Sequence, residues 1–575
     1  MLEKINKHLV GYLFISFFLF SFIFKDLILN ISTDLIDWRD YAYVVWVINQ
    51  AIGNFKEFGT NGLFNGNAFY PLEGIMLFSD LLWPQAFITY FFSLFNSNII
   101  TQFNLMFLTT LGLNTFSIYF FWNNIFKKKN NIFFASLLTN FSPFFFLQLS
   151  HFQMISYWPF FISLGFLFKE KKKLKYLSLS GLFLAVQFYT AVYWTVFLLT
   201  ILGIYYLVRL LKKESIFKLV KELFVIGSVF LVLVGPIYFK YSEVRKAYNI
   251  ERSYHEYVAY SANLSDYAFN WPYRSYLANS KVFTKINSLN NHWSGEIAGS
   301  ASLIVYLLSI IGAILIKKNK DHLSVNISLK EKDLFFLLLT LTGFFFSLGP
   351  KLTFNGTYLA VPLPFAIALK YFAIFDPIRA TARFSALFYI GLFYFATKGL
   401  IKINKKRSIL VILIALILFF VEIIPLSYKS ESNNYYPEIY NQIEENCSKK
   451  ALLLEYPFNQ DNHGANVATN LKYKASQLTA SVEHNCNLVN GYAGFDPQEY
   501  LNYTSTFNSS LKATDSAKLN EIISNKKIDY IKVNKKYLSD DKLKQLENIN
   551  FSSNFGSIAN EDENFLLIEI ENINE

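Results

Sequence analysis

Acidic residues gather directly after the first apolar run of the sequence. Asp37 is three residues from both Asp34 and Asp40, so the three carboxylates would be neighbours on a helix that begins there. Neighbouring carboxylates can share a divalent cation, or raise one another's pKa towards that of a general base. The alternative is a solvated helix start at which aspartate serves as the N-cap and complements the helix dipole.

Four other polar residues lie in the segments that border apolar runs. Asp80 precedes one such run and is either the N-cap of a helix or a ligand of a metal or substrate. His151 directly follows another run and is either a capping residue or a functional group. Glu296 stands just before the run that begins at 298, and Tyr70 lies in the loop that leads to the run at 81–95. We expect Tyr70, His151 and Glu296 to contact a substrate.

Two arginines near the end of the apolar region have a spacing that suits an anion. Arg379 and Arg383 are four residues apart, so on a helix they share one face and present two planar, permanently charged forks to a phosphate. Lys370 is a third cation in the same segment. The alternative is that these side chains snorkel to lipid headgroups. The arrangement favours phosphate binding at a membrane surface.

The composition indicates that an integral membrane protein positions these residues. Of 575 residues, 53% are hydrophobic and only 17% charged, which is too apolar for an average soluble protein. A helix needs roughly 20 residues to cross a ~30 Å hydrocarbon core. Twelve apolar runs approach that length: 9–29, 81–95, 99–126, 131–150, 153–168, 174–190, 192–211, 218–240, 298–317, 332–349, 384–400 and 408–428.

The distribution of charge orients these runs. If the run at 81–95 lies in the outer interface, the other eleven span and the basic clusters fall in cytoplasmic loops, as Lys and Arg usually do. Those clusters lie at residues 4–7, 127–129, 169–175, 209–221, 317–332 and 398–407. The net charge is +18 on the first 428 residues and −7 on the rest, so the basic excess reflects topology and excludes nucleic acid as the partner.

Two domains are therefore predicted. Residues 1–428 form a polytopic α-helical domain with large outer loops at 30–98, 241–297 and 350–383. Residues 429–575 form a small soluble α/β domain outside the membrane, because short strand-like runs at 452–456, 528–533 and 565–570 alternate with helix-compatible stretches. The N-terminus is cytoplasmic in a multi-pass protein of the inner or plasma membrane.

The two cysteines, Cys447 and Cys486, both fall in this outer domain. An oxidising compartment would allow a disulfide between them, and the alternative is a pair of small buried thiols. The motifs of the common soluble enzymes are missing, among them a P-loop, a dinucleotide-binding glycine turn, HExxH, paired CxxC and a nucleophile elbow.

Residues 37–42 (DWRDYA) resemble the acidic motif that opens the first outer loop of the aminoarabinose and protein O-mannosyl transferases, which belong to the GT-C superfamily of polytopic glycosyltransferases. In that superfamily a first-loop aspartate acts as catalytic base or ligates a metal. The resemblance assigns this role to Asp37, with Asp40 as second choice. It implies Mg or Mn as a possible cation, held by Asp37, Asp40 and Asp80.

The chain also resembles an uncharacterised bacterial branch of GT-C-like proteins that carry an outer C-terminal domain. The features that carry this likeness follow one another along nearly the whole chain: 69–71 (FYP), 79–80 (SD), His151, 260–262 (YSA), 361–364 (VPLP), 379–384 and 490–492 (NGY) with Pro497.

The resemblance implies an inverting hexosyl or pentosyl transferase of the cell envelope. Its donor would be a polyprenyl-phosphate sugar, with the phosphate on Arg379, Arg383 and Lys370, and its acceptor an unknown glycan, lipid or protein. The alternatives are a transporter of lipid-linked glycans and a non-catalytic scaffold of the same fold.

Overall fold

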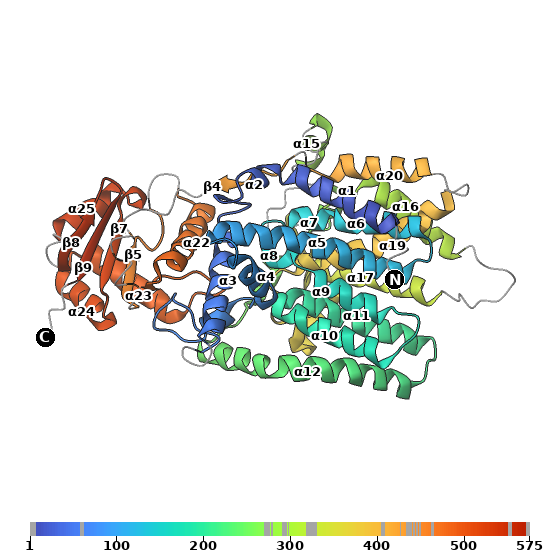
Figure 1. Cartoon of the computed structure of the whole chain (residues 1–575), viewed down its shortest axis with the longest axis horizontal. Coiled ribbons are helices and arrows are strands. Elements are labelled where there is room, and N and C mark those ends of the chain that lie inside the picture. The colour runs from blue at the N-terminus through green and yellow to red at the C-terminus, as the bar shows by residue number, and fades with distance from the viewer. Residues whose placement is uncertain are drawn as a thin grey trace. The chain divides into compact units, whose positions relative to one another are not determined.

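The computed structural model of the chain is mostly helical (Figure 1), and its described residues carry three β-sheets. The residues that the structure describes are 7–57, 62–269, 277, 280–289, 296, 298–317, 330–403, 409–425, 427–432, 440, 443, 447, 450–461, 465–549 and 555–570.

The chain forms two compact units, each assembled from segments that are distant in the sequence. Unit 1 comprises Met1–Leu29, Phe107–Tyr238 and Glu251–Lys429. Unit 2 comprises Asn30–Met106, Phe239–Ile250 and Ser430–Glu575. The whole of the predicted first outer loop, residues 30–98, therefore belongs to the same unit as the C-terminal tail.

Unit 1 is a helical assembly with one β-hairpin. Its helices are α1 (Lys7–Ile23), α2 (Lys25–Leu29), α6 (Lys129–Asn140), α7 (Pro143–Leu147), α8 (Phe152–Ile155), α9 (Trp158–Leu167), α10 (Leu174–Thr190), α11 (Val192–Leu211), α13 (Tyr254–Ala259), α14 (Asp266–Phe269), α15 (Lys281–Asn287), α16 (Leu303–Lys317), α17 (Glu331–Ser347), α18 (Pro364–Tyr371), α19 (Ser385–Ile403) and α20 (Ile409–Ile423). The hairpin pairs β2 (Lys351–Phe354) with β3 (Thr357–Pro362), and the 3-10 turns η2 (Ala373–Phe375) and η3 (Thr381–Phe384) follow α18.

Within the described residues, four helical stretches are long and apolar enough to cross a membrane: α5 (Ile99–Ile125), α11, α12 (Ile216–Ala247) and Thr381–Ile403. Shorter apolar helices cover Lys7–Ile23, Phe152–Leu167, Leu303–Ile314 and Ile409–Ile423. The count of eleven spans stays a prediction. Much of two predicted basic loops, residues 318–329 and 404–408, lies outside the described residues.

Glycines allow the central helices of unit 1 to approach closely. The helix α19 is buried along nearly its whole length and packs against α16 and α17. A Cβ on Gly312 of α16 would lie 2.0 Å from the carbonyl oxygen of Phe395. A Cβ on Gly399 of α19 would lie 2.0 Å from the carbonyl oxygen of Leu308. Small residues at such crossings are the usual means by which membrane helices bring their backbones into contact.

Two predicted spans are interrupted, and proline explains where. The run at 131–150 divides into α6 and α7, because Pro143 has no N–H to continue the first helix. Ser142 caps the new start by accepting a hydrogen bond from the Phe145 amide. The run at 153–168 divides in the same way into α8 and α9, where Pro159 occupies the first turn.

Unit 2 combines the first loop with the tail. The loop supplies β1 (Asp34–Leu35), α3 (Asp40–Lys56), the 3-10 turn η1 (Ile75–Phe78) and α4 (Trp83–Ser93). The tail supplies β4 (Glu431–Ser432), β5 (Leu452–Tyr456), α22 (Val467–His484), β6 (Asn487–Leu488), α23 (Gln498–Lys512), α24 (Ser516–Lys526), β7 (Tyr530–Asn534), the 3-10 turn η5 (Lys535–Tyr537), α25 (Asp540–Asn548), β8 (Gly556–Glu561) and β9 (Phe565–Ile570).

The tail has the α/β architecture that its sequence predicts. Its sheet has the order β6-β5-β7-β9-β8, in which β5 runs parallel to β6 and β7, and β9 runs antiparallel to β7 and β8. Buried apolar side chains such as Leu454, Ile531 and Ile568 pack under the helices. Cys447 and Cys486 form a disulfide, which settles the alternative that the sequence left open.

Backbone hydrogen bonds join the first loop to the tail within unit 2. The Phe69 amide donates to the Asn490 carbonyl, and the Tyr70 amide donates to the Leu488 carbonyl, each at 2.9 Å. The indole of Trp38 donates to the carbonyl oxygen of Glu431. The bonds of Phe69 and Tyr70 extend the edge of the tail's sheet at β6, and the bond of Trp38 reaches β4, so the first loop is part of the folded tail.

Candidate functional site

The carboxylate of Asp37 lies just before α3 and is held by Arg39. It accepts hydrogen bonds from the Arg39 backbone amide (2.8 Å) and from the Arg39 guanidinium, with Nε at 2.9 Å and Nη2 as the second donor. The residue is only 6% exposed. Both carboxylate oxygens of Asp37 are therefore engaged by a permanent positive charge.

The predicted helical spacing of the first-loop acids is wrong. The helix α3 begins at Asp40, and Asp34 lies in β1, where its carboxylate accepts hydrogen bonds from Thr33 and Ser430. The three aspartates consequently do not share one helix face. Arg39 and the paired strands β1 and β4 set their positions instead.

Asp40 and Asp80 both act electrostatically on the hydroxyl of Tyr43. Burial is the largest cause that raises the pKa of Tyr43, and the negative charges of Asp80 and Asp40 raise it further. The hydroxyl of Tyr492 lies 3.4 Å from the Asp40 carboxylate. Asp80 is not the N-cap of α4, as one alternative held. The cap position is Leu82, in a left-handed conformation and without a side-chain hydrogen bond.

By their chemistry, the carboxylates of Asp40 and Asp80 suit a hard cation better than the Asp37 carboxylate does. Carboxylate and hydroxyl oxygens are the ligands that Mg²⁺ and Mn²⁺ prefer, and Asp40 and Asp80 supply two carboxylates. Asp37 is already neutralised by Arg39. Among the described residues, one group of three metal-ligand side chains converges within 4.8 Å, and it consists of the disulfide cysteines with His484.

A buried polar cluster in unit 1 joins three of the residues singled out from the sequence. The Glu296 carboxylate accepts from Nη2 of Arg383, lies 3.3 Å from Nε2 of His151, and accepts from Nε2 of Gln148 at 2.9 Å. Glu296 is 4% exposed and Arg383 5%. His151 occupies the N-cap position of α8, but its side chain bonds Glu296 instead of capping the helix.

This cluster fixes the charge of Glu296. Burial by itself would raise the pKa of the carboxyl, but the positive charge of Arg383 and the interaction with His151 outweigh burial and hold that pKa well below its ordinary value. Glu296 is therefore an anion that neutralises Arg383. A protonated glutamic acid that could act as a general acid is not expected there.

Arg379 and Arg383 do not share a helix face. The helical turn η3 begins only at Thr381, and the Arg379 amide bonds back to the carbonyl of Pro377. The Arg383 guanidinium lies 4.8 Å from the ring centre of Tyr193, whereas that of Arg379 lies 4.7 Å from the ring centre of Tyr260. The two cations thus have different surroundings.

The difference separates their possible roles. Arg383 is buried and balanced by Glu296. Arg379 is half-exposed, and within the described part of the chain its guanidinium makes no hydrogen bond or ion pair, so its donors can meet an anion. Lys370 is exposed at the end of α18, with its ammonium 5.2 Å from the Tyr371 ring centre.

Tyr70 lies in unit 2. Its side chain is 40% exposed and borders a small pocket with Tyr500 and Lys526. The sequence reasoning missed Gln148 and Tyr193, which complete the surroundings of Glu296 and Arg383. A weak signal existed for Gln148, because a glutamine inside an apolar run needs a polar partner.

Comparison with known proteins identifies the family. Residues 15–424 match a family described as a domain of unknown function, DUF6311. The chain belongs to DUF6311. No curated protein matches this DUF6311 sequence.

Solved structures identify the fold of this DUF6311 chain. It is similar to the crystal structure of the Archaeoglobus fulgidus oligosaccharyltransferase in its apo form, with a TM-score of 0.54 and 12% identity over 92% of this chain and 70% of the other. It is also similar to the arabinofuranosyltransferase AftD from mycobacteria, with a TM-score of 0.58 and 10% identity over 93% of this chain and 35% of the other. Both are GT-C glycosyltransferases, so the likeness to the GT-C superfamily expected from the sequence is confirmed as a likeness of fold.

Proposed function

We propose that the protein is a membrane glycosyltransferase that moves a sugar from a polyprenyl-phosphate donor to an acceptor on the outer face of the membrane. The observation that carries the proposal is the GT-C fold, which extends over 92% and 93% of the chain in two comparisons. The acidic group at the start of α3 supports it, because an acceptor hydroxyl needs a base.

Asp40 is the proposed base. Arg39 donates to both oxygens of Asp37, so these oxygens are already engaged and Asp37 is suited to positioning Arg39. In the reaction, an acceptor hydroxyl gives its proton to Asp40 while its oxygen attacks the anomeric carbon. The bond from that carbon to the phosphate oxygen breaks, and its electron pair leaves with the polyprenyl phosphate. Attack opposite the leaving group inverts the anomeric centre.

Arg379 is the proposed ligand of the donor phosphate, with Lys370 beside the lipid. The segment around them carries exposed apolar side chains, among them Ile367, Tyr371 and Phe372. Apolar side chains next to exposed cations are typical of a surface that meets lipid tails and their phosphate groups. We assign Arg383 a structural role, in which its ion pair with Glu296 holds the segment in place. Because Glu296 already neutralises Arg383, the guanidinium has no net charge left for the donor phosphate.

A divalent cation would be held by Asp40 and Asp80 and would neutralise charge on the departing phosphate. The residues of this chain do the rest of the work. They orient the acceptor hydroxyl, accept its proton and bind the phosphate.

The test is sugar transfer or release from a radiolabelled polyprenyl-phosphate hexose by purified protein in lipid, with a Mg²⁺ and Mn²⁺ titration. Loss of a general base typically costs 10²–10⁴-fold, so we expect Asp40→Asn to lose activity by about that factor. Arg379→Ala should lose about 10²-fold or more, because the developing phosphate charge loses a donor.

Two variants are matched controls. Asp26→Asn removes an acid near the end of the first apolar run, and Arg252→Ala removes a cation from another predicted outer loop, where it pairs with Glu256. Both should keep wild-type activity. Wild-type protein that releases no sugar from any of several donors, pentosyl donors included, would refute the proposal. Activity equal to wild type in Asp40→Asn would move the base to Asp37.

A further inference from the structure

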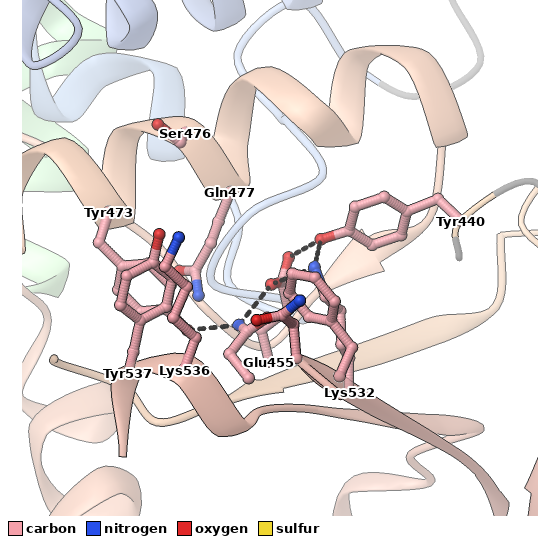
Figure 2. A pocket seen from close by; sticks show the side chains of 11 residues that line it. Tyr440, Glu455, Tyr473, Ser476, Gln477, Lys532, Lys536 and Tyr537 are labelled. Atoms are coloured by element: carbon pink, nitrogen blue, oxygen red, sulfur yellow. Dashed lines mark hydrogen bonds and ion pairs between the residues drawn. The ribbon is translucent and has the colours of Figure 1, made fainter. Parts of the chain in front are cut away.

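The tail contains a cavity that is lined by none of the candidate site residues described above. It has a volume of about 140 Å³ and lies between α22 and the ends of β5 and β7. Figure 2 shows Tyr440 on one side of the space, Tyr473 and Tyr537 on the opposite side, and Glu455 and Lys532 between them. Its lining residues are Tyr440, Glu455, Tyr473, Ser476, Gln477, Lys532, Asn534, Lys536, Tyr537, Asn564 and Phe565.

The floor of the cavity is a buried ion pair. Nζ of Lys532 lies 3.2 Å from Oε2 of Glu455, and the two residues are 2% and 1% exposed. Tyr440 donates its hydroxyl proton to Glu455 (2.7 Å), and Nδ2 of Asn534 donates to the Tyr473 hydroxyl (2.6 Å). Burying a carboxylate and an ammonium costs desolvation free energy that their mutual attraction often does not recover. The pair is therefore weak evidence for stabilisation, and a ligand-binding role would explain it.

The walls of the cavity are aromatic. The Lys532 ammonium lies 3.9 Å from the ring centre of Tyr440 and 4.9 Å from that of Phe565. The rings of Tyr473 and Tyr537 pack against each other at 4.9 Å between centres. The cavity therefore offers flat apolar surfaces around a polar floor.

One polar group in the lining is incompletely hydrogen-bonded. Gln477 is 5% exposed, points from α22 towards the cavity (Figure 2), and within the described residues its Nε2 interacts with the Tyr473 hydroxyl too loosely for a well-formed hydrogen bond. A buried amide without a well-formed hydrogen bond costs free energy. A ligand with a hydroxyl acceptor would remove that cost.

We propose that this cavity binds one neutral sugar residue. The C–H face of a sugar ring packs on aromatic rings, while its hydroxyls both donate and accept, so they can bond the Glu455 carboxylate as well as the Gln477 amide. An anion is disfavoured, because Lys532 is already paired and Glu455 would repel it. An apolar ligand would cover the polar floor without bonding the Gln477 amide.

The disulfide braces one wall of this sugar site. The His484 ring stacks on Tyr440 with 4.6 Å between centres, and the Cys486 amide donates to Nδ1 of His484 at 3.1 Å. Cys486 is bonded to Cys447, seven residues after Tyr440 in the chain. The stacking of His484 and the nearby disulfide therefore both restrict the position of Tyr440.

The opposite wall connects the sugar site to the first loop. The helix α22 supplies Tyr473 and Gln477 to the cavity, and its Thr479 hydroxyl donates to the Ala42 carbonyl of α3 at 2.9 Å. If the proposed transfer is correct, the bound sugar belongs to the acceptor glycan. The binding itself does not depend on that transfer.

The test is equilibrium binding of radiolabelled methyl glycosides to the full-length protein in lipid nanodiscs. The probes are the methyl glycosides of glucose, galactose, mannose, rhamnose, arabinose and N-acetylglucosamine, with inorganic phosphate as competitor. We expect saturable binding of at least one glycoside, with a millimolar or tighter Kd, and no competition by phosphate. Gln477→Leu should weaken that binding at least tenfold, because it removes the amide and nearly keeps the volume.

The matched control is Gln498→Leu, which removes an exposed glutamine on α23 of the same domain and should bind like wild type. Tyr537→Ala, at the rim of the cavity, should also weaken binding. This second variant keeps the proposal testable if Gln477→Leu fails to fold. Absence of saturable binding, equal binding in Gln477→Leu and Tyr537→Ala, or displacement by phosphate would each overturn the proposal. Donor turnover measured on the same samples separates the outcomes, because turnover without glycoside binding rejects the sugar site alone.

Discussion

At the residue scale, substitution of Glu296 tests most directly whether the buried polar cluster stabilises unit 1. Its carboxylate is the common partner of Arg383, His151 and Gln148. Glu296→Gln leaves Arg383 buried without a counter-charge, so we expect a loss of about 3–5 kcal/mol in the free energy of unfolding. Thermal or SDS unfolding of purified protein measures it.

The control for this substitution is Glu243→Gln, which breaks an exposed pair with Lys240. Such pairs are worth about 0–1 kcal/mol, so the unfolding midpoint should hardly move. The double variant Glu296→Gln with Arg383→Met should recover part of the loss. Equal midpoints for Glu296→Gln and wild type would mean that the cluster does not hold unit 1 together.

His484 gives the tail a dependence on pH. Burial is the main cause that lowers the pKa of His484 to about 3, and the positive charge of Lys532 lowers it further. Between pH 6.5 and pH 3 the unfolded chain binds a proton that the folded tail does not. The free energy of unfolding therefore falls as the pH falls through this window, by about 2 kcal/mol between pH 7.5 and pH 5.

Urea unfolding of the tail at the two pH values measures this slope. His484→Asn should flatten it, whatever its effect on absolute stability, because asparagine does not titrate. The exposed variant His255→Gln should keep the wild-type slope. A slope that survives in His484→Asn would assign the titration to another group.

The sequence predicted which residues matter better than it predicted how they meet. It selected Glu296, His151 and Arg383 separately, but nothing in the spacing joins residues that are 87 or more positions apart. It placed Arg379 and Arg383 on one helix because a spacing of four suits a helix. The helical turn η3 begins only at Thr381, so Arg379 lies before it and the two arginines do not share a helix.

At the scale of elements, the crossing of α16 and α19 has no room for a side chain. Gly312→Val and Gly399→Val would each place atoms about where a backbone carbonyl of the other helix lies. Overpacking usually costs about 1–3 kcal/mol, and a clash with backbone on both sides should reach or exceed the upper value. Thermal unfolding in detergent and the yield of folded protein measure it.

The matched control is Gly203→Val on α11, because a Cβ at Gly203 meets no atom within 4 Å. Its midpoint should stay close to that of wild type. Equal losses in all three variants would trace the effect to β-branching in a helix, and the close crossing would then contribute nothing.

The apolar pattern of the tail's sequence predicted the strands whose side chains are largely buried. The strands β5 and β9 were expected because they are short, mostly apolar runs. The strand β8 (GSIANE) was missed because it is an edge strand with mostly exposed side chains. The pairing of residues 67–70 with β6 was also missed, because it depends on backbone groups that carry no sequence signal.

At the scale of the whole molecule, the charge pattern predicts opposite locations for the two ends of the chain. An odd number of spans and basic cytoplasmic loops place the N-terminus inside and Glu575 outside. Alkaline phosphatase fused after Glu575 should be active, and green fluorescent protein at the same position should be dark. Fluorescent protein inserted after Lys213 should fluoresce. Fluorescence at Glu575 would require an even number of spans or the reverse orientation.

The bonds between the first loop and the tail impose an order on biosynthesis. About 400 residues of the chain separate Trp38 from Glu431, and about as many separate Phe69 from Asn490. At about 5–20 residues per second, the ribosome needs roughly 20–80 s to make the tail partners of a loop that is already synthesised. During that interval the Trp38 indole and the Phe69 amide lack their hydrogen-bond acceptors in the tail, so this part of the first loop completes its folding only after the last segment is made.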